Sequence, residues 1–240
     1  MKHAFRAALV VPYLLTVVSV GADSPDKFTP PPGEETDQVK TLIARADSAL
    51  QSGKSTTDVL ADPDYLPAHE WPRFRALIRR HATSSRLAMV CSNEPGDPMV
   101  VTGRVIDQTG KARPGAILYA YQTSAKGWYS DRAAHIAAHE GDRKYARLFG
   151  YLKTDENGRF ELRTIRPAGY PGSNLPAHIH FEVERAENPL VVLTTEIQFD
   201  DDPRLTPDMR TRSRSEGFVI GVVRTETDKS KRVEVELKTR

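Results

Sequence analysis

Two histidines one residue apart, His178 and His180, are well placed in this sequence to bind a metal ion. On an extended strand, residues i and i+2 point to the same face, so both imidazoles can be directed toward one point. A His-x-His pair alone is at least as often a pair of half-buried strand histidines. Here Tyr170 precedes it on a Gly-Tyr-Pro turn, and a Pro-Ala step leads into His178. This combination favours a metal site.

The surrounding sequence resembles the core of the intradiol ring-cleavage dioxygenases, the family that contains catechol and protocatechuate dioxygenases. The resemblance is carried by Gly158-Arg-Phe-Glu-Leu-Arg-Thr-Ile-Arg-Pro, then Tyr170-Pro, then Pro176-Ala-His-Ile-His-Phe. The opening strands of the family are similar to Val101-Thr-Gly-Arg-Val-Ile-Asp and Pro114-Gly-Ala-Ile-Leu-Tyr-Ala-Tyr-Gln, and its first tyrosine ligand falls in Ala125-Lys-Gly-Trp-Tyr-Ser. The resemblance spans residues 94–199.

This resemblance implies one iron site formed by Tyr129, Tyr170, His178 and His180 with a solvent ligand. Iron(III) is a hard cation that favours anionic oxygen, and its binding lowers the pKa of a phenol far below the free value of about 10. Two phenolates stabilise the ferric state, and two neutral imidazoles complete the shell without excess charge. The implied cofactor is Fe(3+), and such a site is coloured by charge transfer from phenolate to iron.

The resemblance also implies a reaction, the cleavage of a catechol-like aromatic diol with dioxygen. The diol would bind iron through both oxygens, with Tyr170 and His178 axial and Tyr129 and His180 equatorial. Tyr170 would depart and accept a proton, which makes it the expected catalytic residue. Dioxygen would attack the activated ring, and an anhydride followed by hydrolysis would give a muconate-type diacid. No organic cofactor is implied.

The sequence departs from the family pattern at two positions near the site. Leu175 stands three residues before His178, where much of the family has an arginine. On the later strand, where the family usually offers glutamine, the alignment selects Glu196, or Gln198 if it slips by two residues. The metal ligands remain, but the substrate stays open: a hydroxyquinol-like, bulky or lignin-derived diol is an alternative, and so is an iron-binding homologue without ring cleavage.

The elements that must position these residues are mainly β. Short β-prone runs separated by turn signals begin at Asp97, and Asn157-Gly158 is a hairpin signal because both residues tolerate positive φ. The runs predict an antiparallel β-sandwich core with N-terminal α-helices. They cover residues 99–106, 116–121, 150–153, 159–165, 178–183, 190–199, 217–224 and 232–237.

Two helices are predicted before the strands. Apolar residues from Val39 to Leu50 recur at helical spacing, and Gly53 ends the pattern. A second helix is expected over residues 70–85, with Trp71 on its apolar face. Its arginines lie largely elsewhere and are interpreted as a solvated face rather than an anion site. They are Arg73, Arg75, Arg79 and Arg80.

The chain divides into four predicted parts: a signal peptide over 1–22, a proline-rich linker over 23–36, a helical region over 37–93 and a dioxygenase-like domain over 94–240. A charged start, an apolar run and small residues before Asp23 are typical of a secretory signal. A retained membrane anchor is the alternative, but a span needs about 20 apolar residues. We therefore expect an exported protein, periplasmic or secreted, with no stable membrane anchor after processing.

Charge and cysteine content limit the partners. Cleavage at residue 22 removes two of the 34 basic residues, leaving a balance with the 32 acidic ones, so nothing favours nucleic acid as a partner. The expected partners are a small aromatic diol and dioxygen. Cys91 is the only cysteine, which excludes an intramolecular disulfide, and we interpret it as a packing residue. The N-terminal helices favour a homodimer, with a monomer as the alternative.

A few other side chains in the sequence are alternative metal ligands. His135 and His139 are four residues apart, which suits one helix face, but they lack the His-Glu-x-x-His order and a third ligand. Tyr151 is a competitor of Tyr129, and packing is expected for it. Tyr119 and Tyr121 also have the spacing of a packed strand face. A rival of another class is an exported, transthyretin-like β-sandwich binding module, which would have no need of all four iron ligands.

Overall fold

The computed structural model describes residues 34–130, 146–187 and 190–239. The predicted signal peptide, all of the linker but its last three residues, and the histidine pair His135 and His139 lie outside the described residues. Within the described ranges, no helix is both long and apolar enough to cross a membrane.

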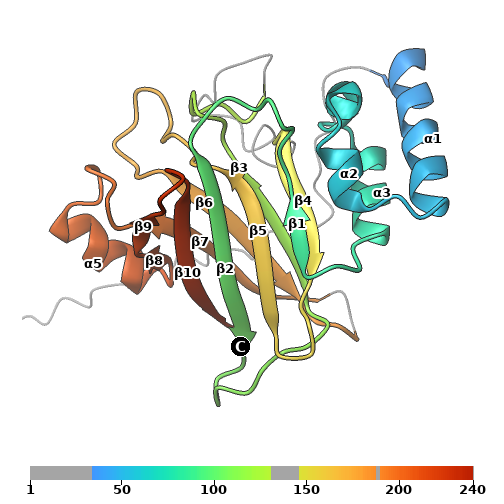
Figure 1. Ribbon diagram of the computed structural model, residues 1–240. Coiled ribbons are helices and arrows are strands. Elements are labelled where there is room, and N and C mark those ends of the chain that lie inside the picture. The colour runs from blue at the N-terminus through green and yellow to red at the C-terminus, as the bar shows by residue number, and fades with distance from the viewer. Residues whose placement is uncertain (1–33, 131–145, 188–189, 240) are drawn as a thin grey trace, which may run out of the picture.

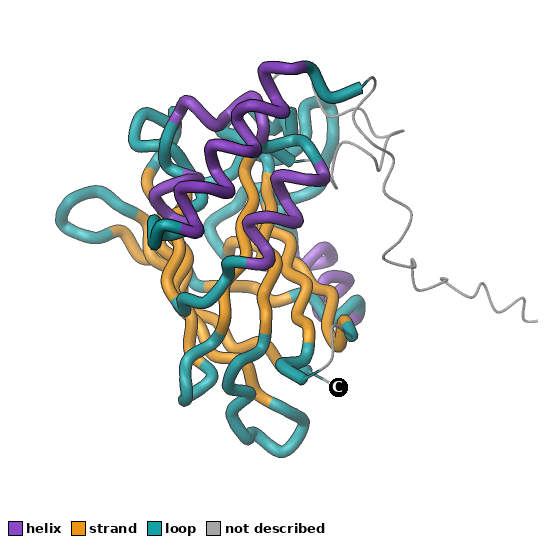
Figure 2. The backbone as a smooth tube through the Cα atoms, turned by 90° about the vertical axis from the view of Figure 1, so that its right-hand side faces the viewer, coloured by secondary structure: helices purple, strands orange, loops and turns teal. Residues whose placement is uncertain are grey.

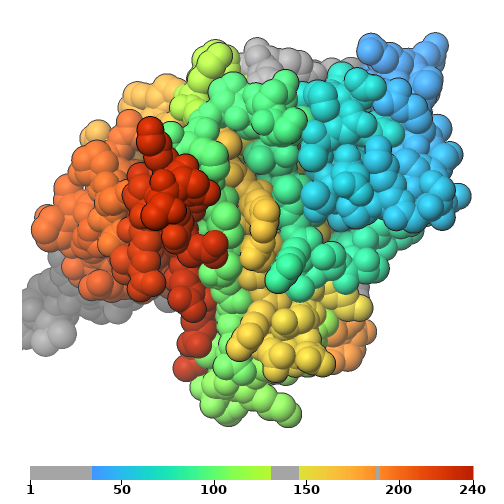
Figure 3. Space-filling view, in the orientation of Figure 1, coloured from blue at the N-terminus to red at the C-terminus, as the bar shows by residue number. Residues whose placement is uncertain are grey.

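The N-terminal helices form a layer at one end of the molecule (Figure 1). They are α1 (Asp37–Gln51), α2 (Thr56–Leu60), the 3-10 helix η1 (Pro63–Ala68) and α3 (Pro72–Arg80). Helix α1 begins where the hydroxyl of Thr36 accepts a hydrogen bond from Val39 N, and its apolar stripe is buried, as the spacing predicts. This layer packs on β1 (Arg86–Ala88) and β4 (Leu148–Lys153). Figure 2, viewed from the helical side, shows the helices in front of the strands, and Figure 3 shows the same layer as the blue and cyan surface at the right.

Helix α3 ends earlier than the expected boundary at residue 85. The carbonyl of Ser84 accepts a hydrogen bond from Lys153 N at 2.9 Å, and that of Ser85 accepts one from Glu161 N at 2.8 Å. The backbone carbonyls of both serines therefore bond to neighbouring strands and do not continue the helix. The expectation of a longer helix was wrong because these partners lie far along the chain.

In the part of the chain that the structure describes, ten strands build two five-stranded sheets, in the order β1-β5-β2-β10-β9 and β4-β3-β6-β7-β8. The remaining strands are β2 (Pro98–Ile106), β3 (Ile117–Gln122), β5 (Arg159–Ile165), β6 (His178–Glu184), β7 (Val191–Phe199), β8 (Val219–Gly221), β9 (Val223–Thr225) and β10 (Lys231–Lys238), with helix α5 (Pro207–Ser215) between β7 and β8. The mainly β fold with N-terminal helices is as predicted.

The prediction of purely antiparallel sheets is wrong, because both sheets are mixed. Strand β1 pairs with β5 in parallel, β10 with β2, and β8 with β7. Of these parallel strands, β10 is the longest, and it pairs with β2 along its whole length. Strands β1 and β8 are short and lie at sheet edges. Strand β1 lies within residues 37–93, the region predicted to be helical, so the end of that region belongs to the first sheet.

The two sheets enclose a common core. The rings of Phe160 on β5 and Phe181 on β6 face each other with centroids 5.7 Å apart, which joins the first sheet to the second. Gly103 on β2 allows this packing, because a Cβ there would lie 2.6 Å from Phe160 Cζ and 2.8 Å from the carbonyl oxygen of Val235. This close packing holds strand β6 against the first sheet.

Arg75 fixes helix α3 to the second sheet. Its side chain is buried, Nη1 donates to the carbonyl of Ala146 at 2.9 Å, and its guanidinium lies 3.9 Å above the ring centre of Phe149. It also donates to the hydroxyl of Tyr119. The interpretation of these arginines as a solvated face is therefore wrong for Arg75, whose charge is satisfied inside the protein.

Candidate metal centre

Strand β6 presents both predicted histidines to one place. His178 and His180 are buried, and their Nε2 atoms lie 3.1 Å apart. His178 Nδ1 lies 2.8 Å from the carbonyl oxygen of Pro176. Because a carbonyl only accepts, Nδ1 carries the hydrogen, and the lone pair of Nε2 faces the neighbouring histidine. The Pro-Ala step before the strand thus sets the tautomer of the first histidine.

Both predicted tyrosines reach the same two nitrogens. Tyr129 Oη lies 2.8 Å from His180 Nε2, Tyr170 Oη lies 2.9 Å from His178 Nε2, and the two phenol oxygens are 2.6 Å apart. The loops that carry them touch at Gly127, where a side-chain carbon would overlap the carbonyl oxygen of Gly169. A glycine at this point, with φ +79°, allows the two loops to meet.

The spacing of these four donor atoms fits a metal ion. Metal bonds of about 2.0–2.1 Å place adjacent donors of a tetrahedral or octahedral site about 3 Å apart. The observed separations of neighbouring donors are 2.6–3.1 Å. Two phenols and two imidazoles are ligands suited to iron, and the structure brings all four of the predicted residues together.

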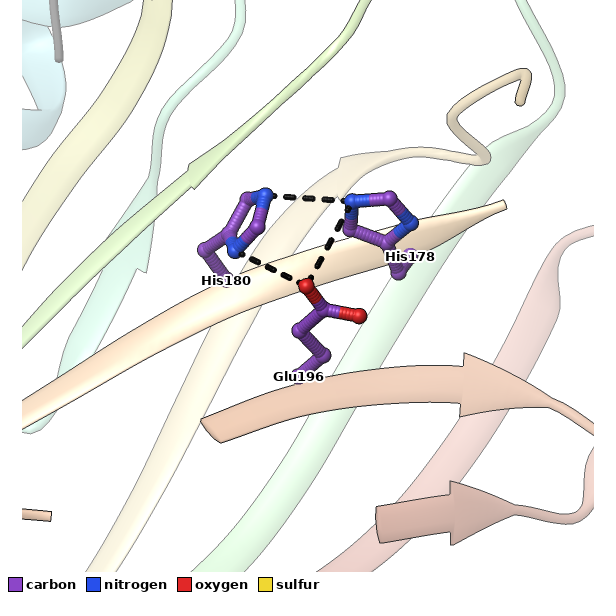
Figure 4. A group of neighbouring side chains, drawn as sticks. All are labelled: His178, His180 and Glu196. Carbon is purple, nitrogen blue, oxygen red and sulfur yellow. Dashed lines mark hydrogen bonds and ion pairs between the residues drawn. The ribbon is translucent and has the colours of Figure 1, made fainter. Parts of the chain in front are cut away.

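Glu196 on β7 lies beside the histidines (Figure 4). Its Oε1 is 3.6 Å from His180 Nδ1 and 3.9 Å from His178 Nε2, and the three side chains form a group that could hold a metal ion. In the register of the sheet, Glu196 is opposite His180 and Gln198 is opposite His178. Of the two alternatives left open by the alignment, Glu196 is therefore the one that contacts both histidines.

Leu175 lies in the loop between Tyr170 and His178. Its side chain is 42% exposed, and its backbone N–H donates to Ser173 Oγ at 3.1 Å. The aliphatic side chain adds no charge to the loop, in contrast to an arginine at this position.

The competing tyrosines stack rather than join the cluster. Ring centroids are 4.7 Å apart for Tyr151 and Tyr119, 4.9 Å for Tyr119 and Tyr121, and 4.5 Å for Tyr121 and His180. Burial raises the pKa of Tyr151 to about 12 and that of Tyr119 well above its ordinary value, which opposes formation of a phenolate. The packing role predicted for these rings is confirmed, and the stack supports one face of His180.

Cys91 is also a packing residue, as predicted. Its side chain is buried, and its Sγ lies 3.6 Å from the carbonyl oxygen of Leu60. Burial raises the pKa of the thiol, which disfavours the reactive thiolate.

A buried ion pair, absent from the sequence predictions, holds the chain next to Tyr129. Arg147 binds both carboxylate oxygens of Glu94, at 2.6 and 2.7 Å, and its backbone N–H donates to the carbonyl of Tyr129 at 2.7 Å. The carbonyl of Arg147 lies 3.1 Å from His69 Nδ1. The pair joins residues 53 positions apart, so no local sequence signal identifies it.

His69 predicts a pH dependence of stability. Burial lowers its pKa to about 4, and within the described residues its Nε2 has no hydrogen-bond partner. Because the unfolded chain takes up this proton near pH 6.5 and the folded protein only near pH 4, stability falls as pH drops through this window. We expect a loss of about 2 kcal/mol between pH 7 and pH 4.5 from this residue.

Urea denaturation at the two pH values measures this effect. The His69→Phe variant is the control, since its ring can stack on Phe74 as the imidazole does, at a centroid distance of 5.1 Å. The variant should lose less stability than the parent protein over the same pH change. Equal losses in the two proteins would show that His69 does not titrate in this window.

Comparison with known proteins places the chain in a family. The sequence model of the family described as Dioxygenase matches residues 70–238, which is more than half of the chain. The chain belongs to the intradiol dioxygenase family. The resemblance described above is thereby confirmed.

Three relatives illustrate the similarity. A catechol 1,2-dioxygenase of Acinetobacter baylyi is 30% identical over 148 residues, which cover 55% of this chain and 45% of the relative. A hydroxyquinol 1,2-dioxygenase of a Rhizobium species is 31% identical over 186 residues, which cover 71% and 56%. A solved catechol 1,2-dioxygenase from an Acinetobacter species, inhibited by bound mercury, has a TM-score of 0.50 and 25% identity, covering 66% of this chain and 57% of the other. The chain spans about half the length of the curated relatives it matches.

Proposed function

We propose that this protein is an exported, non-haem iron(III) dioxygenase that cleaves a catechol-like ring between its two hydroxyl-bearing carbons. The proposal is carried by the convergence of Tyr129, Tyr170, His178 and His180, whose neighbouring donor atoms lie 2.6–3.1 Å apart. Membership of the family supports it, and so do the relatives named catechol and hydroxyquinol 1,2-dioxygenase.

Ferric iron held by these four residues would supply a Lewis acid that binds the diol and activates its ring toward dioxygen. The two phenols differ in their surroundings. Both lie on loops, but Tyr129 is buried, with 1% of its surface exposed, whereas Tyr170 is half-buried. Tyr170 is therefore the phenol that can move aside and accept a proton from a diol hydroxyl at Oη, while Tyr129 keeps its place.

The proposed reaction balances without any further reactant. One diol and one dioxygen molecule give one muconate-type diacid. The carbon–carbon bond between the two hydroxyl-bearing carbons breaks, each of these carbons becomes a carboxyl carbon, and each gains one atom of dioxygen. The diol is oxidised and dioxygen is reduced, so no further oxidant or reductant is needed.

Labelled dioxygen tests this reaction directly. Iron-loaded protein should convert catechol, hydroxyquinol or a bulkier catechol into a ring-opened diacid that carries two labelled oxygen atoms. The Tyr170→Phe variant should be slower by about 100-fold or more, because it lacks the proton acceptor. Iron-loaded protein that leaves the whole panel intact would contradict ring cleavage and support an iron-binding homologue instead.

Export is proposed from the sequence of residues 1–22. The mature protein should begin at Asp23 if the chain is cleaved after Ala22. N-terminal sequencing of protein recovered from the periplasm or the culture medium measures the cleavage point. Full-length chain retained inside the cell would contradict the proposal.

A further inference from the structure

Behind the histidines, three polar side chains form a hydrogen-bonded chain. Ser213 on α5 donates to Gln198 Oε1 at 2.7 Å, and Gln198 Nε2 donates to Glu196 Oε2 at 3.3 Å. Ser213 and Gln198 are 1% and 3% exposed. A buried polar chain of this kind holds its members in fixed orientations, since each loses a hydrogen bond by turning away. Glu196 is therefore held by one carboxylate oxygen.

The other carboxylate oxygen of Glu196 is directed toward the histidines, as Figure 4 shows. It contacts Nδ1 of His180 at 3.6 Å, whereas Tyr129 Oη approaches the same ring at Nε2, 2.8 Å away. The two nitrogens lie on different edges of the imidazole. Glu196 thus approaches His180 at a different ring nitrogen from Tyr129, and the same carboxylate oxygen lies farther, 3.9 Å, from His178 Nε2.

We infer that Glu196 is a positioning residue of the metal centre, which acts through His180; this inference rests on the proposed iron site. Its carboxylate favours the tautomer with hydrogen on Nδ1, so that Nε2 keeps its lone pair for the metal. The negative charge also makes the imidazole a stronger donor, which favours the ferric over the ferrous ion. His178 differs, since its Nδ1 faces the neutral carbonyl of Pro176 at 2.8 Å.

The Glu196→Gln variant tests this inference, because glutamine keeps the size of the side chain and removes its charge. Substituting the residue that contacts a metal-bound histidine typically lowers metal affinity by about 10- to 100-fold. We expect the ratio of the affinities for ferric and ferrous iron to fall about 10-fold in the variant. This change raises the reduction potential of the iron by about 59 mV. Iron should also be lost faster to a chelator, and the phenolate charge-transfer band should shift.

Two further variants make the test specific. Glu161→Gln removes a carboxylate from β5 of the other sheet, where Glu161 pairs with Arg163 at 2.9 Å, and should leave the potential unchanged. Gln198→Leu keeps Glu196 but removes the donor that holds it, so it should shift the potential in the same direction by a smaller amount. This second variant also tests the inference if Glu196→Gln does not fold.

The outcomes separate this inference from the proposed function. A shifted potential in Glu196→Gln supports the inference even if the parent protein cleaves no diol, in which case only the proposed function fails. An unchanged potential and unchanged iron retention in a parent protein that does cleave diols would overturn the inference alone. Failure of the parent protein to bind iron would overturn both.

Discussion

The Tyr129→Phe variant should lose the proposed iron and, with it, the proposed ring-cleaving activity. The hydroxyl of Tyr129 lies between two other donors of the cluster, 2.6 Å from Tyr170 Oη and 2.8 Å from His180 Nε2. Removing it leaves the ring in place but deletes one of the two proposed anionic ligands. Substituting a residue that only supports a ligand lowers metal affinity about 10- to 100-fold. Substituting a ligand itself should therefore lower the affinity for iron by more than about 100-fold.

Iron content, the visible spectrum and the rate of diol cleavage measure this effect. Tyr151→Phe is the matched control, because it removes a phenol oxygen from β4, in the sheet that carries the two histidines, without changing the cluster itself. We expect the control to retain iron and activity within about twofold, as is usual for changes away from the machinery of a site. A Tyr129→Phe protein with full iron content and unchanged colour would contradict the assignment of Tyr129 as a ligand.

The Arg147→Leu variant should have the largest effect on stability. The side chains of Arg147 and Glu94 are only 9% and 5% exposed, and they are joined by two hydrogen bonds. Removing the arginine leaves a buried carboxylate without this partner, a change that typically costs about 3–5 kcal/mol. The destabilisation should also extend to the proposed metal centre, since the backbone N–H of Arg147 donates to the carbonyl of Tyr129.

Urea denaturation of the parent protein and three variants checks this prediction. Arg163→Leu serves as the control, because Arg163 is 66% exposed in its pair with Glu161 and should cost about 1 kcal/mol or less. The double variant Arg147→Leu with Glu94→Leu should recover part of the loss, because no charge is then left buried. Equal effects of the Arg147 and Arg163 substitutions would show that the buried pair contributes no more than a surface pair.

The sequence predicted those parts of the fold and site that depend on short-range patterns. Alternation on an extended strand was enough to place His178 and His180 on one face, and helical spacing was enough to identify α1. Tyr129 lies 41 positions before Tyr170, and no local pattern brings them together. Their convergence was expected only because the sequence resembles a known family.

Long-range pairings account for what the sequence did not predict. The parallel pairing of β10 with β2 joins distant parts of the chain, and alternation within a strand does not specify its neighbour. Helix α5 was missed because its residues are almost all polar, with only Ser213 buried, so it has no apolar stripe. Arg75 looked solvated because three of its partners, Tyr119, Ala146 and Phe149, lie 44 to 74 positions away.

The most direct test of the metal centre is a visible spectrum with iron analysis of the purified protein, repeated after anaerobic addition of catechols. We predict near-stoichiometric iron, a reddish colour from phenolate-to-iron charge transfer, and a shift of the band when a catechol binds. A protein that remained colourless and free of iron after reconstitution would contradict the iron site and favour a transthyretin-like binding module.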